Sequence, residues 1–261
     1  MSVQSGSAVG SALGDLLLRM ERLLEALERD GSSARFFLGT YLRTTRAVGE
    51  AITAGAFEDP AWVELWDVEF AGRYLDALDA HRRDPASAPP TWRRAFGADP
   101  SLPPEAHVLL GMNAHINVDL PQSLVAVIGP EDFTDGALLS SRRRDHERID
   151  DILAERVAHE DVALEQAGGR RTLVDRVTAP LNRRAAQRFL KESRRSVWAN
   201  TSVLHRARDE GEACLTRRIA DLEVAGCSRV ADLLRPGPVL MRLAVHGFGV
   251  RLPADPPPPW D

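Results

Sequence analysis

Apolar residues recur along this chain mainly at intervals of three and four positions, the spacing of an α-helix with one buried face. The first such run extends over Leu13–Leu27 and predicts a long amphipathic helix. A Gly-Ser pair breaks the pattern, and a second helix is expected over about residues 33–54. Asp59 followed by Pro60 predicts the start of a third helix, because Asp is a favoured N-cap and Pro is tolerated in the first turn. A proline pair predicts a short helix from about residue 90.

Proline and glycine divide the rest of the chain into further helical segments. A second proline pair predicts a central helix from about residue 104, and a long helix is expected over about residues 135–166. Another helix is expected from about residue 181 to about residue 222. We expect Ala225-Gly226 to interrupt the pattern before a short helix over residues 228–234.

The pattern as a whole predicts a helical fold without a sheet. No run of four or more residues combines apolar–polar alternation with β-branched composition, and the sequence has neither an internal repeat nor a linker long enough to separate domains. The predicted fold class is therefore all-α, a single-domain irregular helical bundle of about seven to nine helices over residues 1–261. We expect its core over about residues 8–235 and an irregular Pro-rich tail over residues 236–261.

Composition narrows the classes of partner. The chain of 261 residues is 44% hydrophobic and has a net charge of -5, which allows a sizeable core but argues against nucleic acid or an anionic membrane as a partner. No apolar run approaches the ~20 residues of a membrane span. Residues 1–7 lack the charged and apolar regions of a signal peptide, so the expected location is cytoplasmic. Cys214 and Cys227 are too few for a disulfide framework, and we expect two reduced thiols.

The most informative stretch is the central helix over residues 106–121. It is apolar on nearly every side, which is typical of a buried helix, yet it contains two His, two Asn and one Asp. Buried polar groups are costly unless they are paired. The segment therefore contains either a polar network that fixes the core or a reactive site.

Two pairs within this segment are four residues apart. His115 and Asp119 lie one turn apart on the same side of a helix, and Asn113 and Asn117 form a second pair on roughly the opposite side. A His and an Asp at this spacing suit three roles: two ligands of one metal ion, a carboxylate that orients an imidazole for acid–base chemistry, or a hydrogen bond within the core. The spacing alone leaves all three open.

Other residues are candidates for the same centre. His107 lies on the adjoining stripe of the helix and is a third catalytic candidate. In a metal site with Zn or Fe, His115 and Asp119 would need further ligands. These could be His107 or a residue of the long helix, namely Asp145, His146 or Asp150, and Asp145 is the one we select. Asp67 and Glu69 sit among aromatic residues, and either could face the same centre, although neither is specific.

Two small details of the central helix carry structural predictions. Gly111 costs about 1 kcal/mol relative to Ala inside a helix, so we expect another helix or a ligand to approach the backbone there. Pro121 must kink or end the helix, because proline lacks an N–H donor and clashes with the preceding turn.

Amide and indole groups supply the predicted substrate-binding set. Amides bind substrate oxygens, and indoles wall apolar pockets. The candidates are Asn113, Asn117, Asn200, Trp198 and Trp66. The sequence has no phosphate-binding Gly-rich loop, G-x-S-x-G, H-E-x-x-H or C-x-x-C motif, which disfavours dinucleotide binding, P-loop chemistry, common serine hydrolysis and zinc ribbons.

Several phrases together resemble one family, the domain of unknown function DUF5995. The most specific is Met-Asn-Ala-His-Ile-Asn-x-Asp-Leu-Pro over residues 112–121. Weaker matches are Asp-Pro-Ala-Trp, Phe-Ala-Gly-Arg-Tyr, Trp-Arg-Arg-Ala-Phe and Val-Trp-Ala-Asn over residues 59–62, 70–74, 92–96 and 197–200. The resemblance covers roughly residues 35–205 and implies a helical fold, without a reaction.

Two hypotheses on function follow. The first is an enzyme acting on a small, largely apolar metabolite by metal-assisted or His–Asp acid–base chemistry at His115 and Asp119, in a hydrolysis, cyclisation or isomerisation. The alternative is a non-catalytic helical protein that binds a small molecule or a partner, in which the His, Asn and Asp residues form a structural network. A homodimer is among the partner hypotheses.

Overall fold

A computed structural model describes residues 5–166, 195–236 and 247–253, and every statement on the fold concerns these residues. They form α-helices joined by short turns, with no strand among them. The fold class predicted from the sequence, an all-α irregular bundle, is confirmed. The longer elements are α1 (Ser5–Arg29), α2 (Ala34–Thr53), α3 (Pro60–Arg83), α4 (Pro90–Phe96), α5 (Pro104–Ala114), α6 (Leu120–Val127), α7 (Gly136–Gln166) and α9 (Glu212–Leu234), and residues 195–210 are also helical.

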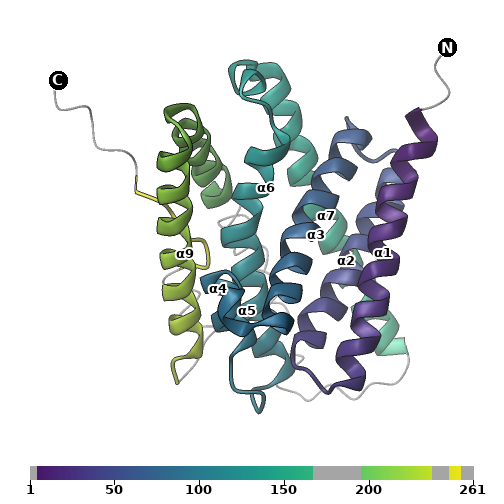
Figure 1. Ribbon diagram of the computed structural model, residues 1–261. Helices are drawn as coiled ribbons and strands as arrows, with labels where there is room; N and C mark the ends of the chain where they lie inside the picture. Colours follow the sequence, from purple (N-terminus) through teal and green to yellow (C-terminus); the bar gives the residue numbers. More distant parts are fainter. Residues whose placement is uncertain (1–4, 167–194, 237–246, 254–261) are drawn as a thin grey trace.

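The central helical run separates two groups of helices. In Figure 1, α1, α2 and α3 stand on the right and α9 stands on the left. Helix α5 continues into α6, and together they form a run in the middle between these two sides. Helix α1 packs on α2 and α3, while α5 contacts α2, α4 and α9. The central run is therefore enclosed by helices from both ends of the chain.

The core is rich in aromatic side chains where these helices meet. Tyr74 of α3 and Trp92 of α4 are among the largest fully buried side chains. Both belong to one apolar cluster with Phe37 and Tyr41 of α2 and Leu110 of α5. This aromatic cluster lies directly against the polar segment singled out in the sequence.

The chain passes through the central segment without a sharp break. A π-helical turn, η2 (His115–Asp119), joins α5 to α6, and the Leu120 N–H donates to the His115 carbonyl five residues earlier. Pro121, in the first turn of α6, has no N–H for the usual bond to the Asn117 carbonyl. The wider turn accommodates the proline, and π-helical turns of this kind are frequent at functional sites.

The predicted break at Ala225-Gly226 is wrong, because α9 is continuous from Glu212 to Leu234. Gly226 serves close packing: a Cβ there would lie 2.6 Å from Val118 Cγ2 and 2.7 Å from Thr91 Oγ1. The helix begins instead after Gly211, whose φ of 122° is accessible mainly to glycine.

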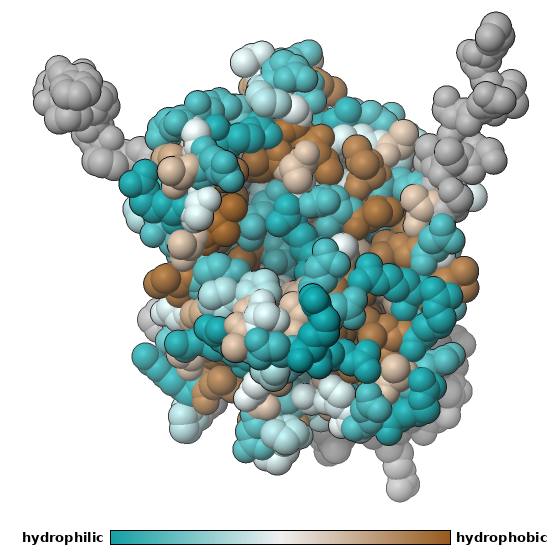
Figure 2. Space-filling model, viewed as in Figure 1, coloured by the Kyte–Doolittle hydropathy of each residue, from teal (hydrophilic) through white to brown (hydrophobic). Residues whose placement is uncertain are grey.

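The surface is mixed in character. Figure 2 shows hydrophilic side chains over much of the face viewed in Figure 1, with smaller hydrophobic patches between them. Within the described ranges, no helix combines the length and the apolar character that a membrane crossing requires. Cys214 and Cys227 are free thiols, as expected.

Gly111 is predicted to be essential for the contact between α5 and α2. A Cβ at this position would lie 2.9 Å from Phe37 Cβ and closer still to the Phe37 ring. Gly111→Ala should therefore lower the free energy of unfolding by about 1–3 kcal/mol, measured by chemical denaturation. Gly72→Ala is the matched control, because a Cβ there meets nothing within 4 Å, and it should raise stability by up to about 1 kcal/mol. Equal effects of the two substitutions would contradict this packing.

Candidate functional site

His115 and Asp119 form a buried hydrogen-bonded pair. His115 Nδ1 lies 3.0 Å from Asp119 Oδ2, and the two residues are 3% and 5% exposed. The Trp92 indole donates to the same oxygen at 2.8 Å. The Asp119 carboxylate thus accepts two hydrogen bonds, one from His115 of the same turn and one from Trp92, which links the turn to α4.

The imidazole of His115 is enclosed by aromatic rings. Phe70 of α3 stacks on it with ring centroids 3.6 Å apart, and Tyr41 of α2 meets it edge-on at 4.5 Å. Phe37, Tyr74 and Trp92 have their ring centroids within 5.8–6.1 Å of it. We call these five rings the aromatic cage: Phe37, Tyr41, Phe70, Tyr74 and Trp92.

The contacts of Asp119 fix the tautomer of His115. A carboxylate that accepts from the imidazole places the proton on Nδ1 and leaves Nε2 as the basic nitrogen, an assignment from the hydrogen-bond network. Nε2 is buried and finds no hydrogen-bond partner among the described residues. Burial lowers the pKa of His115, and the bond to Asp119 only partly opposes this effect. At neutral pH the ring is therefore neutral, with a free lone pair inside the aromatic cage.

Further buried polar atoms without partners lie in the same part of the core. In the part of the chain that the structure describes, the hydroxyl of Tyr74 and Oδ2 of Asp67 are buried and unpaired, whereas the Tyr41 hydroxyl has the Thr45 side chain as a hydrogen-bonding neighbour. Burial raises the pKa of Tyr41 well above its usual value, and the charges of Asp67 and Asp119 add to the rise. Each such group costs about 1–3 kcal/mol. The unpaired hydroxyl of Tyr74, which belongs to the aromatic cage, is the unusual feature of this core.

Asp67 is the most perturbed carboxyl of this region. It projects from α3 into the core and is 5% exposed. Burial, followed by the charge of Glu64, raises the pKa of Asp67 from 3.8 to about 7. Glu69, the other carboxyl considered in this stretch, forms an ion pair with Arg73 at 2.9 Å, and its side chain is 37% exposed.

The asparagines have a different role from the predicted one. Asn117 Nδ2 donates to Asn113 Oδ1 at 3.0 Å, and Asn113 Nδ2 donates to the Gly226 carbonyl of α9 at 3.1 Å. Asn117 and Asn200 also bind the backbone of residues 247–253. Because both amide atoms of all three asparagines are used within the protein, the structure does not place them as substrate ligands.

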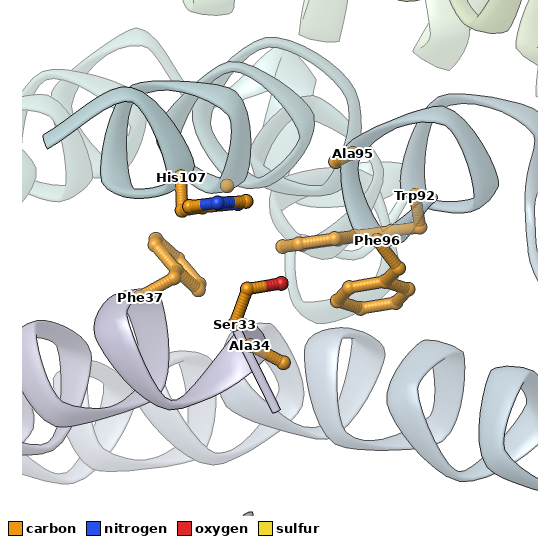
Figure 3. Close-up of a pocket in the computed structure, with 8 residues that line it drawn as sticks. Ser33, Ala34, Phe37, Trp92, Ala95, Phe96 and His107 are labelled. Atoms are coloured by element: carbon orange, nitrogen blue, oxygen red, sulfur yellow. The ribbon is translucent and has the colours of Figure 1, made fainter. Parts of the chain in front are cut away.

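His107 lies apart from the His115–Asp119 pair and lines a small cavity between α2, α4 and α5. Figure 3 shows its ring facing the side chains of Phe37, Trp92 and Phe96. The cavity volume is about 10 Å³, near the minimum for one water molecule. Phe37 and Trp92 line it and also belong to the aromatic cage, so the cavity adjoins the cage. The full lining is Ser33, Ala34, Phe37, Trp92, Ala95, Phe96, His107 and Gly111.

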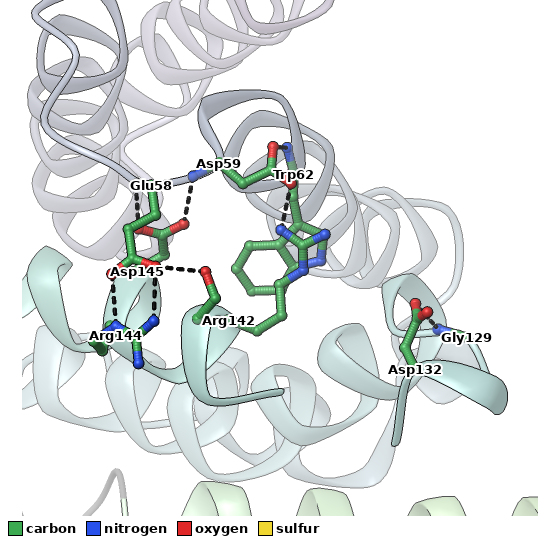
Figure 4. A network of polar contacts seen from close by, with 9 residues as sticks. Glu58, Asp59, Trp62, Gly129, Asp132, Arg142, Arg144 and Asp145 are labelled. Atoms are coloured by element: carbon green, nitrogen blue, oxygen red, sulfur yellow. Dashed lines mark hydrogen bonds and ion pairs between the residues drawn. The ribbon is translucent and has the colours of Figure 1, made fainter. Parts of the chain in front are cut away.

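The proposed metal ligands do not come together. Asp145 accepts the backbone N–H groups of Glu58 and Asp59 at 2.7 and 2.9 Å, and so anchors the loop before α3 to α7 (Figure 4). Within the described ranges, no group of three or more His, Cys, Asp or Glu residues is arranged to hold a metal ion. The set of His115, Asp119 and Asp145 is thus not assembled.

The two predicted tryptophans are core residues with satisfied indoles. The Trp66 indole donates to Ser123 Oγ at 3.1 Å, and the Trp198 indole to His146 Nδ1 at 3.3 Å. Trp66 is one ring removed from the site, since it stacks on Phe70, which in turn stacks on His115. Neither tryptophan is among the ring neighbours of His115.

The residues that sequence reasoning missed are mostly in the aromatic cage. Tyr41, Tyr74 and Trp92 come from three helices, and only the packing of these helices brings them to His115. One signal was present in the sequence: a buried indole N–H needs an acceptor, and the carboxylate of Asp119 is a suitable one.

Comparison with known proteins gives a family and no activity. A family model described as a family of unknown function, DUF5995, matches residues 13–236, which confirms the resemblance seen in the sequence phrases. No curated protein and no solved structure matches the chain.

The raised pKa of Asp67 predicts a pH dependence of stability. In the unfolded chain this carboxyl ionises near 3.8, but in the folded protein only near 7. Its contribution is therefore most favourable below pH 3.8 and is lost as the pH rises through about 7. A pKa rise from 3.8 to about 7 corresponds to roughly 4 kcal/mol. Asp67→Asn should thus gain stability relative to the unmodified chain between pH 4 and pH 8, by urea denaturation at each pH.

Asp76→Asn is the control for this experiment. Asp76 is on the same helix, but its side chain is 79% exposed, so its replacement should leave the pH profile unchanged. Parallel profiles for the unmodified chain and Asp67→Asn would show that Asp67 does not titrate in the predicted way.

Proposed function

Because the chain belongs to the DUF5995 family, whose function is unknown, its activity must be inferred from the site, and we propose an enzyme that moves a proton on a small, largely apolar organic molecule. His115 is the general base, and Asp119 is its orienting group. The reaction class is isomerisation or cyclisation by proton transfer. No metal is part of this proposal, because the three proposed ligands are not assembled.

One observation carries the proposal: the free Nε2 of His115 lies in a cage that also contains the unpaired hydroxyl of Tyr74. A core that evolved only for stability would pair these groups or replace them with apolar ones, since orphaned polar atoms are costly. A substrate with an oxygen atom in an apolar frame would satisfy them.

The chemistry follows from these groups. Nε2 of His115 accepts a proton from a carbon next to a carbonyl group, which leaves an enolate. A tyrosine hydroxyl of the cage donates a hydrogen bond to the enolate oxygen. The imidazolium formed on His115 is stabilised by Asp119, whose position is held by Trp92. Where the substrate has a double bond next to that carbon, the enolate is a conjugated dienolate, and return of the proton from His115 to its far carbon shifts the double bond and completes an isomerisation with no external reactant.

The cage sets the size and polarity of the substrate. Its walls are aromatic, which favours an apolar molecule. The adjoining cavity of about 10 Å³ holds no more than one water molecule. A larger ligand therefore requires a ring of the cage to move, and Phe37 is suitably placed because it lines the cavity and contacts His115.

A second candidate function is supported by the close packing of the aromatic cage. A non-catalytic helical protein would use the His115–Asp119 pair only to fix the packing of α4 on the central turn. The complete burial of both residues favours this alternative. The two candidates differ in whether His115 transfers protons. A cytoplasmic location and a homodimer remain predictions.

Proton exchange into cyclohexanone tests the enzymatic proposal. The full chain in D₂O at neutral pD should accelerate deuterium incorporation next to the carbonyl group, as followed by NMR. His115→Gln should reduce this acceleration at least about 100-fold, because general base catalysis typically contributes that much. Circular dichroism of the variant shows whether it stays folded. A folded variant that is as active as the unmodified chain would refute the role of His115, and no acceleration by the unmodified chain would favour the non-catalytic alternative.

The unpaired hydroxyl of Tyr74 gives a test that needs no substrate. Tyr74→Phe should leave the free energy of unfolding unchanged or raise it by about 1 kcal/mol, because the hydroxyl has no partner within the described chain. Thr91→Val is the matched control: the Thr91 hydroxyl is equally buried but donates to Glu223 Oε2 at 2.6 Å. Its loss should cost about 1–3 kcal/mol. A comparable loss in Tyr74→Phe would mean that the Tyr74 hydroxyl is part of a structural network.

A further inference from the structure

Two asparagines bind the backbone of the chain's own C-terminal segment. Asn117 Nδ2 donates to the Phe248 carbonyl at 3.0 Å, and its Oδ1 accepts the Val250 N–H at 3.3 Å. Asn200 repeats the arrangement two residues later: it donates to the Val250 carbonyl at 3.0 Å and accepts the Leu252 N–H at 2.9 Å. Each amide thus bridges a carbonyl and the N–H two residues further on, as a neighbouring strand would.

The side chains of this segment alternate in burial. Phe248, Val250 and Leu252 are at most 7% exposed, whereas Arg251 between them is exposed. Phe248 joins the main core cluster. Val250 and Leu252 join a cluster formed by residues of η2, α6, the helical segment 195–210 and α9. The surrounding helices therefore form a groove with one aromatic and two aliphatic positions.

We propose that this groove is a binding site for an extended peptide, and that residues 247–253 occupy it in cis. The peptide that fits has an aromatic residue followed, at every second position, by two aliphatic residues. Backbone recognition by the two asparagines supplies affinity, and the three apolar positions supply specificity.

Two observations support an exchangeable peptide. Asn117 is oriented independently of the segment, because it also donates to Asn113, which is bound to the Gly226 carbonyl of α9. In addition, both asparagines that bind the peptide lie within residues 13–236, the region matched by the family model, whereas the bound segment lies outside it. The two asparagines therefore belong to the part of the chain that the family model describes, and the bound segment does not.

A covalently attached segment competes at a high effective concentration, so the test must weaken it. Val250→Pro in the full chain removes the N–H that Asn117 accepts. Arg251→Pro is the matched control, because neither asparagine accepts the N–H of residue 251. A fluorescently labelled synthetic peptide of residues 247–253 is added to each, and binding is measured by anisotropy.

The Val250→Pro chain should bind the peptide at least about tenfold more tightly than the Arg251→Pro chain or the unmodified chain. Adding Asn200→Ala to Val250→Pro should weaken binding again by about tenfold, the effect of about 1.4 kcal/mol. A folded Val250→Pro chain that binds no peptide, or equal binding by all variants, would overturn the proposal.

Should Val250→Pro lose its helical circular dichroism signal, hydrogen exchange of the unmodified chain decides instead. The amides of Val250 and Leu252 should then exchange by local opening, faster than the most protected amides of α5. Exchange of these two amides only with global unfolding would show that the segment is a fixed part of the core.

Discussion

The buried carboxylate of Asp119 is the constraint on which this core depends. A carboxylate inside an apolar bundle is stable only if donors surround it. Here His115 from the same turn and Trp92 from α4 both donate to one oxygen. These two bonds place α4, orient the imidazole and fix its tautomer. The aromatic cage then closes around a ring whose position is already set.

The two faces of the central turn have different roles: one faces the proposed site, and the other binds neighbouring parts of the fold. On one side, His115 and Asp119 point into the aromatic cage. On the other side, Asn113 and Asn117 bind α9 and the C-terminal segment. Asn117 lies between His115 and Asp119 in one π-helical turn. A shift of Asn117 when the groove changes its occupant would therefore move the backbone that carries the imidazole. The polar residues noticed in the sequence thus divide into the pair of the proposed site and a pair that is bonded within the fold.

The sequence predicted what depends on local pattern. The fold class, the start of α3 at Asp59-Pro60 and both four-residue pairs follow from helical periodicity and capping. Long-range packing decided the rest. Gly226 does not break α9; it is a glycine because Val118 and Thr91 occupy the space that a side chain there would fill. Asp145 accepts hydrogen bonds from backbone amides 86 and 87 residues away in the sequence. The cage residues Tyr41 and Tyr74 carry no local signal that places them beside His115.

The protonation state of His115 decides whether Asp119 holds a general base in this core. Nitrogen-15 NMR of the imidazole distinguishes the two neutral tautomers and the charged ring. We predict a neutral ring at pH 7 with the proton on Nδ1 and a bare Nε2, and an apparent pKa below the usual 6.5. A charged ring at pH 7, or a proton on Nε2 of the neutral ring, would contradict a general base held by Asp119.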